Sequence, residues 1–467
     1  MFRKPPSGGF FACVSPLLRG GHDLKRSLAL PLSGAFLFWA AEAALLARLP
    51  GFGLAGAVIA ALVVTAALAG CLLVLRLPRR VLVLCAVLGA LLLLARALFF
   101  ARETSDFTDF LQPWTEKLRR LGGIRGLGRE IGNYNVPYMV LLALFSYLKI
   151  PVLYLIKLSS TLFDLLLALS LGLMVRRLGS GVRGGVCFVL ALALPTVFIN
   201  SALWGQCDSV YVSLGLLGLW LCLAEKPGWG MAAFGLSFAF KLQAVFLLPI
   251  LFPLLLAGKV KWFHLPIFPA AYLLAVSPAI LAGRKVLDVL LFYVNSASTA
   301  GSGLNYNSAS MYSLLYFYRL TDTDAAAKAG ILAAALLCLL VCVLFLIKRK
   351  RITERSILFA SLLLCCGLPM LLPHMHDRYF YFCDVLTLCT ACLLPAAAPA
   401  VLLSQLASLL GYHAYFFRRY LLPMRFGFYG LVLTALLAAF LFLDALFAPD
   451  QTPPKGEKAA LDKSPSP

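Results

Sequence analysis

The chain has 467 residues, of which 61% are hydrophobic and only 13% are charged. Because average globular proteins carry roughly 25% charged residues, this composition excludes a soluble globular domain and predicts a membrane protein. The net charge of +21 also suggests nucleic-acid binding, but the basic residues are scattered in short loops between apolar runs, where they act as topology signals. We therefore expect membrane lipids as partners, and no nucleic acid.

Apolar runs close to the length of a membrane-spanning helix recur along the chain. A helix of about 20 residues crosses the hydrocarbon core of a bilayer, and a helix satisfies all of its own backbone hydrogen bonds in lipid. We predict an all-α polytopic membrane protein with about twelve or thirteen transmembrane helices. The expected segments are 28–47, 52–75, 81–100, 152–174, 184–200, 209–224, 230–257, 262–282, 327–347, 355–372, 381–400 and 426–447.

The expected domain organisation is simple. Residues 1–27 form a basic cytoplasmic leader, and residues 28–447 form a single transmembrane domain. Residues 448–467 are rich in Pro and Lys, which predicts a disordered tail. The large loop at 101–151 carries polar motifs and is expected to hold a helix lying on the membrane surface.

Basic residues near the ends of transmembrane segments favour the cytoplasmic side. Bases in the leader, among them Lys25 and Arg26, put the N-terminus in the cytoplasm and the loop 101–151 outside. The polar loops then collect on the outer face, provided that the run 230–257 is split near Lys241. The same rule puts the later bases inside: Arg418, Arg419 and Arg425. We therefore predict a multi-pass protein of a bacterial plasma membrane, with its functional site on the outer face.

The expected surface helix at 106–121 begins with two carboxylates. Its apolar residues, such as Phe107, Leu111 and Trp114, recur at helical spacing. Asp106 and Asp109 lie near the helix start, where a negative charge is favourable, so both carboxylates could serve only the helix end. The alternative is that one of them is a catalytic base. Of the two, Asp106 is the first candidate and Asp109 the second.

Two further outer segments carry groups that can contact sugar hydroxyls: amide and phenol groups in the first, and amide, aromatic and carboxylate groups in the second. The first contains Gly and Pro as well, which are typical of a turn; the second lies between two apolar runs and could instead be a helix start. The candidate sugar or acceptor contacts in these segments are Asn133, Tyr134, Asn135, Trp204, Gln206 and Asp208.

Lys241 and Gln243 interrupt an otherwise apolar run of the sequence. A lysine at membrane depth is costly, so Lys241 either reaches the surface or faces a cavity, an acid or a phosphate. Gln243 is a candidate sugar contact. The sequence predicts no cofactor.

The outer loop near residue 376 has the sequence His-Met-His-Asp-Arg-Tyr-Phe. His374 and His376 suggest a metal site, but no other clustered ligands accompany them. Arg378 is better interpreted as a phosphate ligand, because its guanidinium can bind an anion through two hydrogen bonds. The two histidines can donate to phosphate or hydroxyl oxygens, and Tyr379 is a candidate sugar contact.

Together these motifs resemble the GT-C superfamily of integral membrane glycosyltransferases, and most closely its bacterial GPI-type mannosyltransferase-like group. Three stretches carry the resemblance: Ser-Asp-Phe at 105–107 with the Asn-Tyr-Asn turn at 133–135, Trp-Gly-Gln at 204–206 with Phe-Lys-Leu-Gln at 240–243, and His-Asp-Arg-Tyr-Phe at 376–380. The last departs from the group's His-Glu-Arg-Tyr-Phe, because Asp377 replaces Glu. The motifs cover roughly residues 100–385.

The resemblance implies a sugar donor linked to polyprenyl phosphate, with mannose as one candidate sugar, and a glycan, lipid-linked or protein acceptor. It also implies inversion at the anomeric carbon, Asp106 as the general base, and Arg378 and Lys241 as ligands of the donor phosphate. A transporter or lipid-glycan flippase is the main alternative, because buried ionisable groups also mark transport pathways. A scaffold would not require Asp106, Asp208 and Arg378 to converge, whereas an enzyme would.

Overall fold

The computed structural model describes residues 23–298, 303–315 and 323–447. Residues 1–22, most of the expected leader, and the expected tail at 448–467 lie outside the described residues. So do residues 299–302 of the polar outer loop. Within the described part the chain is helical apart from two short strands, which confirms the predicted all-α class.

Eight helical stretches of the described chain are long and apolar enough to cross a membrane. Six are the helices α2 (Leu54–Leu75), α3 (Arg79–Ala97), α6 (Val152–Leu178), α15 (Thr323–Ile347), α16 (Glu354–Leu371) and α19 (Arg425–Phe447). The other two are the stretch Trp262–Leu281, which contains α12 (Ile267–Leu281), and the stretch Pro395–Phe417, which contains α18 (Ala398–Phe417). A ninth forms if α7 (Gly181–Ala193) counts together with the segment Pro195–Trp204, from which it is bent by 50°. The polytopic membrane fold is confirmed, but the described chain holds fewer full-length spans than the expected twelve or thirteen.

The difference arises because several expected spans are short or broken. These shorter helices are α9 (Asp208–Leu223), α10 (Pro227–Phe240), α11 (Leu251–Leu256) and α17 (Tyr381–Leu393). Helix α1 (Asp23–Ala47) is described in full only from residue 33 and is not among the eight. A helix rises about 1.5 Å per residue, so a helix of 16 residues such as α9 falls short of a hydrocarbon core of about 30 Å. Two 3₁₀ segments precede α11, namely η6 (Leu242–Phe246) and η7 (Leu248–Ile250).

The predicted break in the run 230–257 is confirmed. Helix α10 ends at Phe240, and Lys241 is extended, with φ −155° and ψ 135°. The extended Lys241 separates α10 from the 3₁₀ segment η6, and its side chain contacts Asp208, one of the polar residues that the sequence analysis singled out.

Helix α18 is where the sequence-based map fails. We expected one span at 381–400 and no helix immediately after it, but α17 ends at Leu393 and α18 follows the short turn η11 (Pro395–Ala397). Pro395 cannot donate a helical hydrogen bond. Polar residues such as Gln405 then lower the hydropathy of the next run, and Gln405 is buried against Thr196.

The direction of α18 corrects the topology. Its C-terminal end lies beside the loop that carries Asp106, and Arg418 donates to Ser105 Oγ at 3.2 Å. The expectation that put Arg418, Arg419 and Arg425 on the face opposite Asp106 is therefore wrong.

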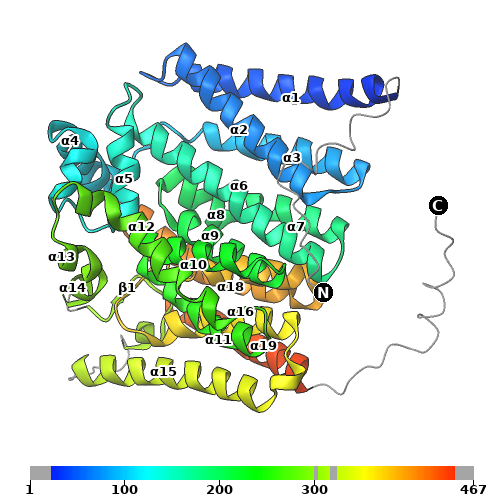
Figure 1. Cartoon of the computed structure of the whole chain (residues 1–467), viewed down its shortest axis with the longest axis vertical. Coiled ribbons are helices and arrows are strands. Elements are labelled where there is room, and N and C mark those ends of the chain that lie inside the picture. Colours follow the sequence, from blue (N-terminus) through cyan, green and yellow to red (C-terminus); the bar gives the residue numbers. More distant parts are fainter. Residues whose placement is uncertain (1–22, 299–302, 316–322, 448–467) are drawn as a thin grey trace, which may run out of the picture.

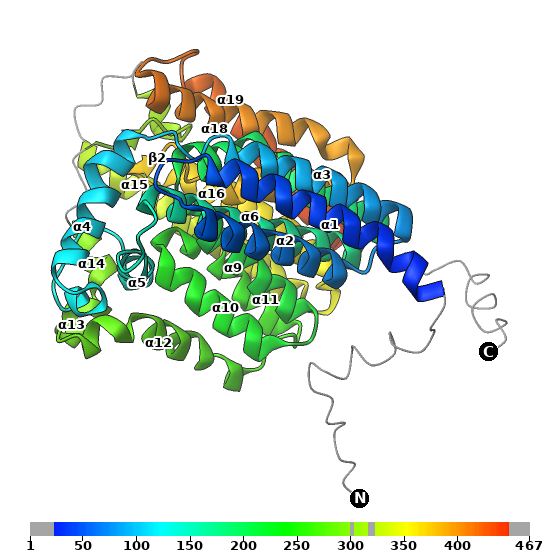
Figure 2. The same ribbon diagram turned by 90° about the horizontal axis from the view of Figure 1, so that it is seen from above.

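The helices lie side by side, with α1 to α3 at one side of the molecule and α15 at the other (Figure 1). The connecting segments gather at one end of the helices in both views (Figures 1 and 2), and we call this end the site end. The elements of the site end are η3 (Phe107–Leu111), α4 (Gln112–Arg120), η4 (Gly123–Gly128), α5 (Val136–Phe145), α13 (Val286–Leu290), α14 (Phe292–Ser298), β1 (Asn305–Tyr306), η9 (Met311–Leu314) and β2 (Met375–His376).

The opposite end is tied together by ion pairs around Glu354, at the start of α16. Arg177, at the end of α6, donates to both oxygens of Glu354 at 2.6 and 2.7 Å. Lys259 donates to the same carboxylate at 3.1 Å. The remaining short elements are α8 (Pro195–Phe198), η5 (Ile199–Trp204), η8 (Trp262–His264) and η10 (Arg349–Arg351).

Candidate active site

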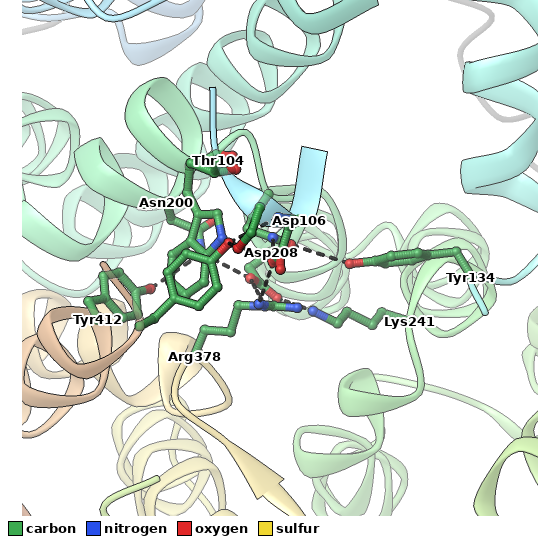
Figure 3. Close-up of polar contacts among 12 residues, drawn as sticks. Thr104, Asp106, Tyr134, Asn200, Asp208, Lys241, Arg378 and Tyr412 are labelled. Atoms are coloured by element: carbon green, nitrogen blue, oxygen red, sulfur yellow. Dashed lines mark hydrogen bonds and ion pairs between the residues drawn. The ribbon is translucent and has the colours of Figure 1, made fainter. Parts of the chain in front are cut away.

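Asp106 lies immediately before the π-helix η3 at the site end, and its side chain makes no capping hydrogen bond to that helix. Instead its Oδ2 atom accepts from Trp204 Nε1 at 3.0 Å and from Gln206 Nε2 at 2.5 Å. Arg378 Nη1 is a third donor, at 3.4 Å (Figure 3). The side chain is 23% exposed, so a substrate can reach this carboxylate. These contacts argue against a role confined to the helix end.

A tight turn positions the two neutral donors. The π-helix η5 ends at Trp204, and Gly205 follows with φ 75°, a backbone conformation that glycine adopts at little cost. The turn is closed by Gln206, whose N–H donates to Asn200 O at 2.9 Å. Trp204 and Gln206 therefore reach Asp106 from one turn, and α9 begins directly after it at Asp208.

Asp208 is completely buried and has three polar partners. Lys241 donates to its Oδ1 atom, and Asn200 Nδ2 donates to its Oδ2 atom at 2.9 Å. Arg378 Nε forms an ion pair with Oδ2 at 3.3 Å. A buried charge is stable only when it is paired and hydrogen-bonded, and the extended backbone at Lys241 brings the required ammonium to the carboxylate.

Arg378 lies between the two carboxylates and belongs to the loop that follows β2. Its contacts with Asp106 and Asp208 are 3.4 and 3.3 Å long, and its guanidinium lies 5.1 Å from the centre of the Trp204 ring. Its Nε atom is buried and, apart from the ion pair with Asp208, makes no hydrogen bond to the described residues. The guanidinium therefore retains donor capacity for an anion.

The two residues before Arg378, His376 and Asp377, both have pKa values that are shifted in favour of the uncharged form. Burial, reinforced by Arg378, lowers the pKa of His376 to about 4. The imidazole is thus neutral at physiological pH, and it stacks on Tyr306 with 4.7 Å between ring centres. Burial also raises the pKa of Asp377 to about 7, so this carboxyl is partly protonated near neutral pH.

Several predicted site residues join this cluster. Tyr134 donates to Gln206 Oε1 at 3.3 Å, and Lys241 lies 5.5 Å from the ring centre of Tyr379. The structure thus brings eight of the predicted residues into one connected set: Asp106, Tyr134, Trp204, Gln206, Asp208, Lys241, Arg378 and Tyr379. His376 touches this set through its ring contact with Tyr379.

Other predicted residues lie elsewhere. Asp109 is exposed and accepts from its neighbour Thr108 at 3.0 Å, and Asn133 is exposed as well. Asn135 is buried, caps α5 and donates to Ala239 O at 3.0 Å. His374 Nδ1 contacts Gly303 O at 2.7 Å, which is a contact to the loop before β1. Gln243 is half-buried in η6.

The sequence analysis missed four residues that contact the cluster directly or hold it in place: Ser105, Asn200, Tyr412 and Tyr415. A signal for the two tyrosines exists, because a spacing of three residues puts both on one face of a helix. This spacing has meaning only within a helix, and no helix was predicted for residues 401–425. In the described part of the chain, no three His, Cys, Asp or Glu side chains group in a way that could hold a metal ion.

The fold and the site define a class: a polytopic helical membrane protein in which an arginine at one end of the helices bridges a reachable carboxylate and a buried one. The comparison with protein families makes this class specific. Residues 133–373, just over half of the chain, match the model of glycosyltransferase family 87. The chain therefore belongs to glycosyltransferase family 87, a GT-C-type membrane glycosyltransferase family, which confirms the predicted superfamily. No curated protein and no solved structure matches the chain.

Proposed function

We propose that the protein transfers a sugar from a polyprenyl-phosphate-linked donor to a hydroxyl group of a lipid-linked glycan, a cell-envelope polymer or a protein, with Asp106 as the general base. The observation that carries the proposal is the position of Asp106, which is reachable from solvent and lies 3.4 Å from Arg378. Membership of a glycosyltransferase family supports the reaction class.

The proposed reaction inverts the anomeric carbon. The side-chain hydrogen bonds to Asp106 within the described chain all end on Oδ2, which leaves Oδ1 for the acceptor. The acceptor hydroxyl gives its proton to the carboxylate while its oxygen forms a bond to the anomeric carbon. The bond from that carbon to the phosphate oxygen breaks on the opposite face, and polyprenyl phosphate leaves with the electron pair.

We propose that Arg378 and Lys241 stabilise the negative charge on the leaving phosphate, because fixed cations at a developing charge lower the barrier. Asp208 binds both cations and so keeps them in place between turnovers. The Nε atom of Arg378 makes an ion pair with Asp208 but no hydrogen bond to the described residues, and this supports a phosphate contact by the guanidinium. Neutral His376 is a further candidate donor, whereas His374 holds the neighbouring loop through Gly303.

Gln206, Tyr134 and Trp204 are the proposed sugar contacts, because Trp204 and Gln206 donate to Asp106 and Tyr134 donates to Gln206. Mannose is the first sugar to test. We also propose that the site end faces outward from a bacterial plasma membrane, with the N-terminus in the cytoplasm. The basic residues at the opposite end, such as Arg177 and Lys259, support this orientation, whereas Arg418 at the site end does not.

The decisive experiment measures sugar transfer in membranes that contain the wild type, Asp106→Asn or Asp109→Asn, supplied with radiolabelled polyprenyl-phosphate sugars and candidate acceptors. We expect Asp106→Asn to lower kcat by roughly 100-fold or more, as loss of a general base does. Asp109→Asn is the matched control and should retain wild-type transfer, because Asp109 is exposed and its side-chain hydrogen bond within the described residues is to its neighbour Thr108.

Two results would contradict the proposal. Equal activity of both variants would remove Asp106 from the base role. An absence of transfer from every donor, with folded protein and suitable acceptors present, would favour the transporter or flippase alternative. The anomeric configuration of the product, determined by NMR, tests inversion separately.

A further inference from the structure

Tyr415, near the end of α18, contacts both sides of the Asp106 site. Its hydroxyl accepts from the backbone N–H of Asp106 at 3.1 Å and shares a hydrogen bond with Ser105 Oγ at 2.9 Å. Its ring stacks on Trp204 with 4.1 Å between ring centres and 25° between ring planes. Trp204 is itself a donor to the Asp106 carboxylate. One side chain therefore holds the backbone of the proposed base and one of its hydrogen-bond donors.

The same face of α18 also reaches the second carboxylate. Tyr412, one helical turn earlier, packs edge-on against Trp204 with 5.1 Å between ring centres. Its hydroxyl accepts from Asn200 Nδ2 at 3.3 Å, and that nitrogen also donates to Asp208 at 2.9 Å. Because residues three apart share a helix face, a single element contacts the supports of both carboxylates.

The residue that caps the end of α18, Arg418, adopts a backbone conformation that lets its side chain contact both Ser105 and Tyr415. Arg418 ends the helix in the left-handed conformation, with φ 54° and ψ 27°, which is unfavourable for a residue other than glycine. From there its guanidinium donates to Ser105 Oγ at 3.2 Å and lies 5.6 Å from the ring centre of Tyr415. An unfavourable backbone persists only where the surrounding structure enforces it. Arg418 thus helps to hold Ser105, which is hydrogen-bonded to the Tyr415 hydroxyl.

We propose that Tyr415 is a positioning residue for the Asp106 carboxylate, and that the end of α18 fixes the orientation of this carboxylate toward the acceptor hydroxyl. The assignment rests on the proposed role of Asp106. It is independent of the family match, because Tyr415 lies outside residues 133–373. A general base must lie within hydrogen-bond reach of the proton that it removes, so loss of this constraint slows the proton transfer and leaves donor binding intact.

The test compares the full-length wild type with Tyr415→Phe, Tyr415→Ala and the control Tyr429→Phe, whose ring is exposed on α19. Tyr415→Phe retains the stacked ring and removes both hydroxyl contacts. We expect its kcat to fall about tenfold with an unchanged KM for the donor, and Tyr415→Ala to fall further. A tenfold change corresponds to about 1.4 kcal/mol. Tyr429→Phe should behave as the wild type.

Hydrogen–deuterium exchange of the peptide that contains Asp106 supplies a readout that does not depend on activity. We expect faster exchange in Tyr415→Phe than in the wild type and Tyr429→Phe. Wild-type exchange together with wild-type kcat in Tyr415→Phe would overturn the proposal, as would a loss of folded protein with unchanged kcat per folded molecule. If the wild type transfers no sugar, the proposed function fails, whereas the exchange measurement still decides whether Tyr415 holds the Asp106 segment.

Discussion

Asp377 is a buried carboxyl directly before the arginine that bridges the two acids of the site. One of its oxygens is buried without a hydrogen-bond partner in the described structure, and burial raises its pKa from 3.8 to about 7. The protonated form adds no charge to a cluster in which Asp106 and Asp208 already balance Arg378 and Lys241. Ionisation of Asp377 would add an unpaired buried negative charge, which is unfavourable.

This raised pKa predicts a pH-dependent stability. Between pH 4 and pH 7 the folded protein binds more protons at Asp377 than the unfolded chain does, so the free energy of unfolding falls as the pH rises through this window. Asp377→Asn removes this titration. We expect the Tm of the variant to exceed that of the wild type by a margin that grows from pH 5 to pH 8, measured by thermal unfolding in detergent. Parallel Tm curves would contradict the shifted pKa; Asp109→Asn is the exposed control.

At the scale of the element, α18 shows how closely a helix must approach the loops of the site. A Cβ atom added at Gly411 would lie 2.7 Å from Asn307 O and 2.8 Å from the Cβ atom of Asp377. Contacts under 3.0 Å require a backbone shift, so only glycine permits this packing. The close approach keeps α18 against the chain that leads into Arg378.

Gly411→Ala should therefore destabilise the protein and impair transfer. Overpacking typically costs about 1–3 kcal/mol, and the improved helix propensity of alanine, about 1 kcal/mol, offsets only part of that cost. We expect a lower Tm and a reduced kcat. Gly70→Ala in α2 is the matched control, because a Cβ atom there meets nothing within 4 Å, and it should be neutral or stabilising. Equal Tm values for the two variants would show that the contact at Gly411 is not tight.

At the scale of the whole molecule, a buried ion pair joins the N-terminal helices to the rest of the bundle. Arg96 of α3 and Asp164 of α6 are both completely buried and lie 3.1 Å apart. Arg96 also donates to Leu192 O at 2.7 Å, and Ser201 donates to Asp164 at 2.5 Å. The pair therefore connects α3, α6, α7 and η5, the element that ends at Trp204.

Removal of one partner leaves an uncompensated charge and costs roughly 3–5 kcal/mol, whereas replacement of both by apolar residues is often neutral. We expect Arg96→Leu to lose most of its folded protein in size-exclusion chromatography. Arg96→Leu/Asp164→Leu should recover much of it. A double variant as poor as the single variant would mean that shape, rather than unpaired charge, causes the loss.

The residues that the sequence identified best are polar groups in apolar surroundings. Lys241 interrupts a long apolar run, and the sequence predicts a break in the helix near it. Because a charge at membrane depth is costly, the sequence also predicts that Lys241 either reaches the surface or faces a cavity, an acid or a phosphate. The break is confirmed, and the structure identifies Asp208 as a partner. Trp204 and Gln206 were placed in a sugar-contact segment, but their hydrogen bonds to Asp106 could not be predicted.

The sequence by itself determined the membrane environment, the all-α class and the polar segments that carry the site, because composition and helical periodicity are local properties of the chain. The tertiary structure decided which side chains contact Asp106, the direction of α18 and the partners of Arg378. Asp106 and Trp204 are 98 positions apart, and Asp106 and Arg378 are 272 positions apart. Contacts over such separations depend on how helices pack together, and no local pattern of residues records that packing.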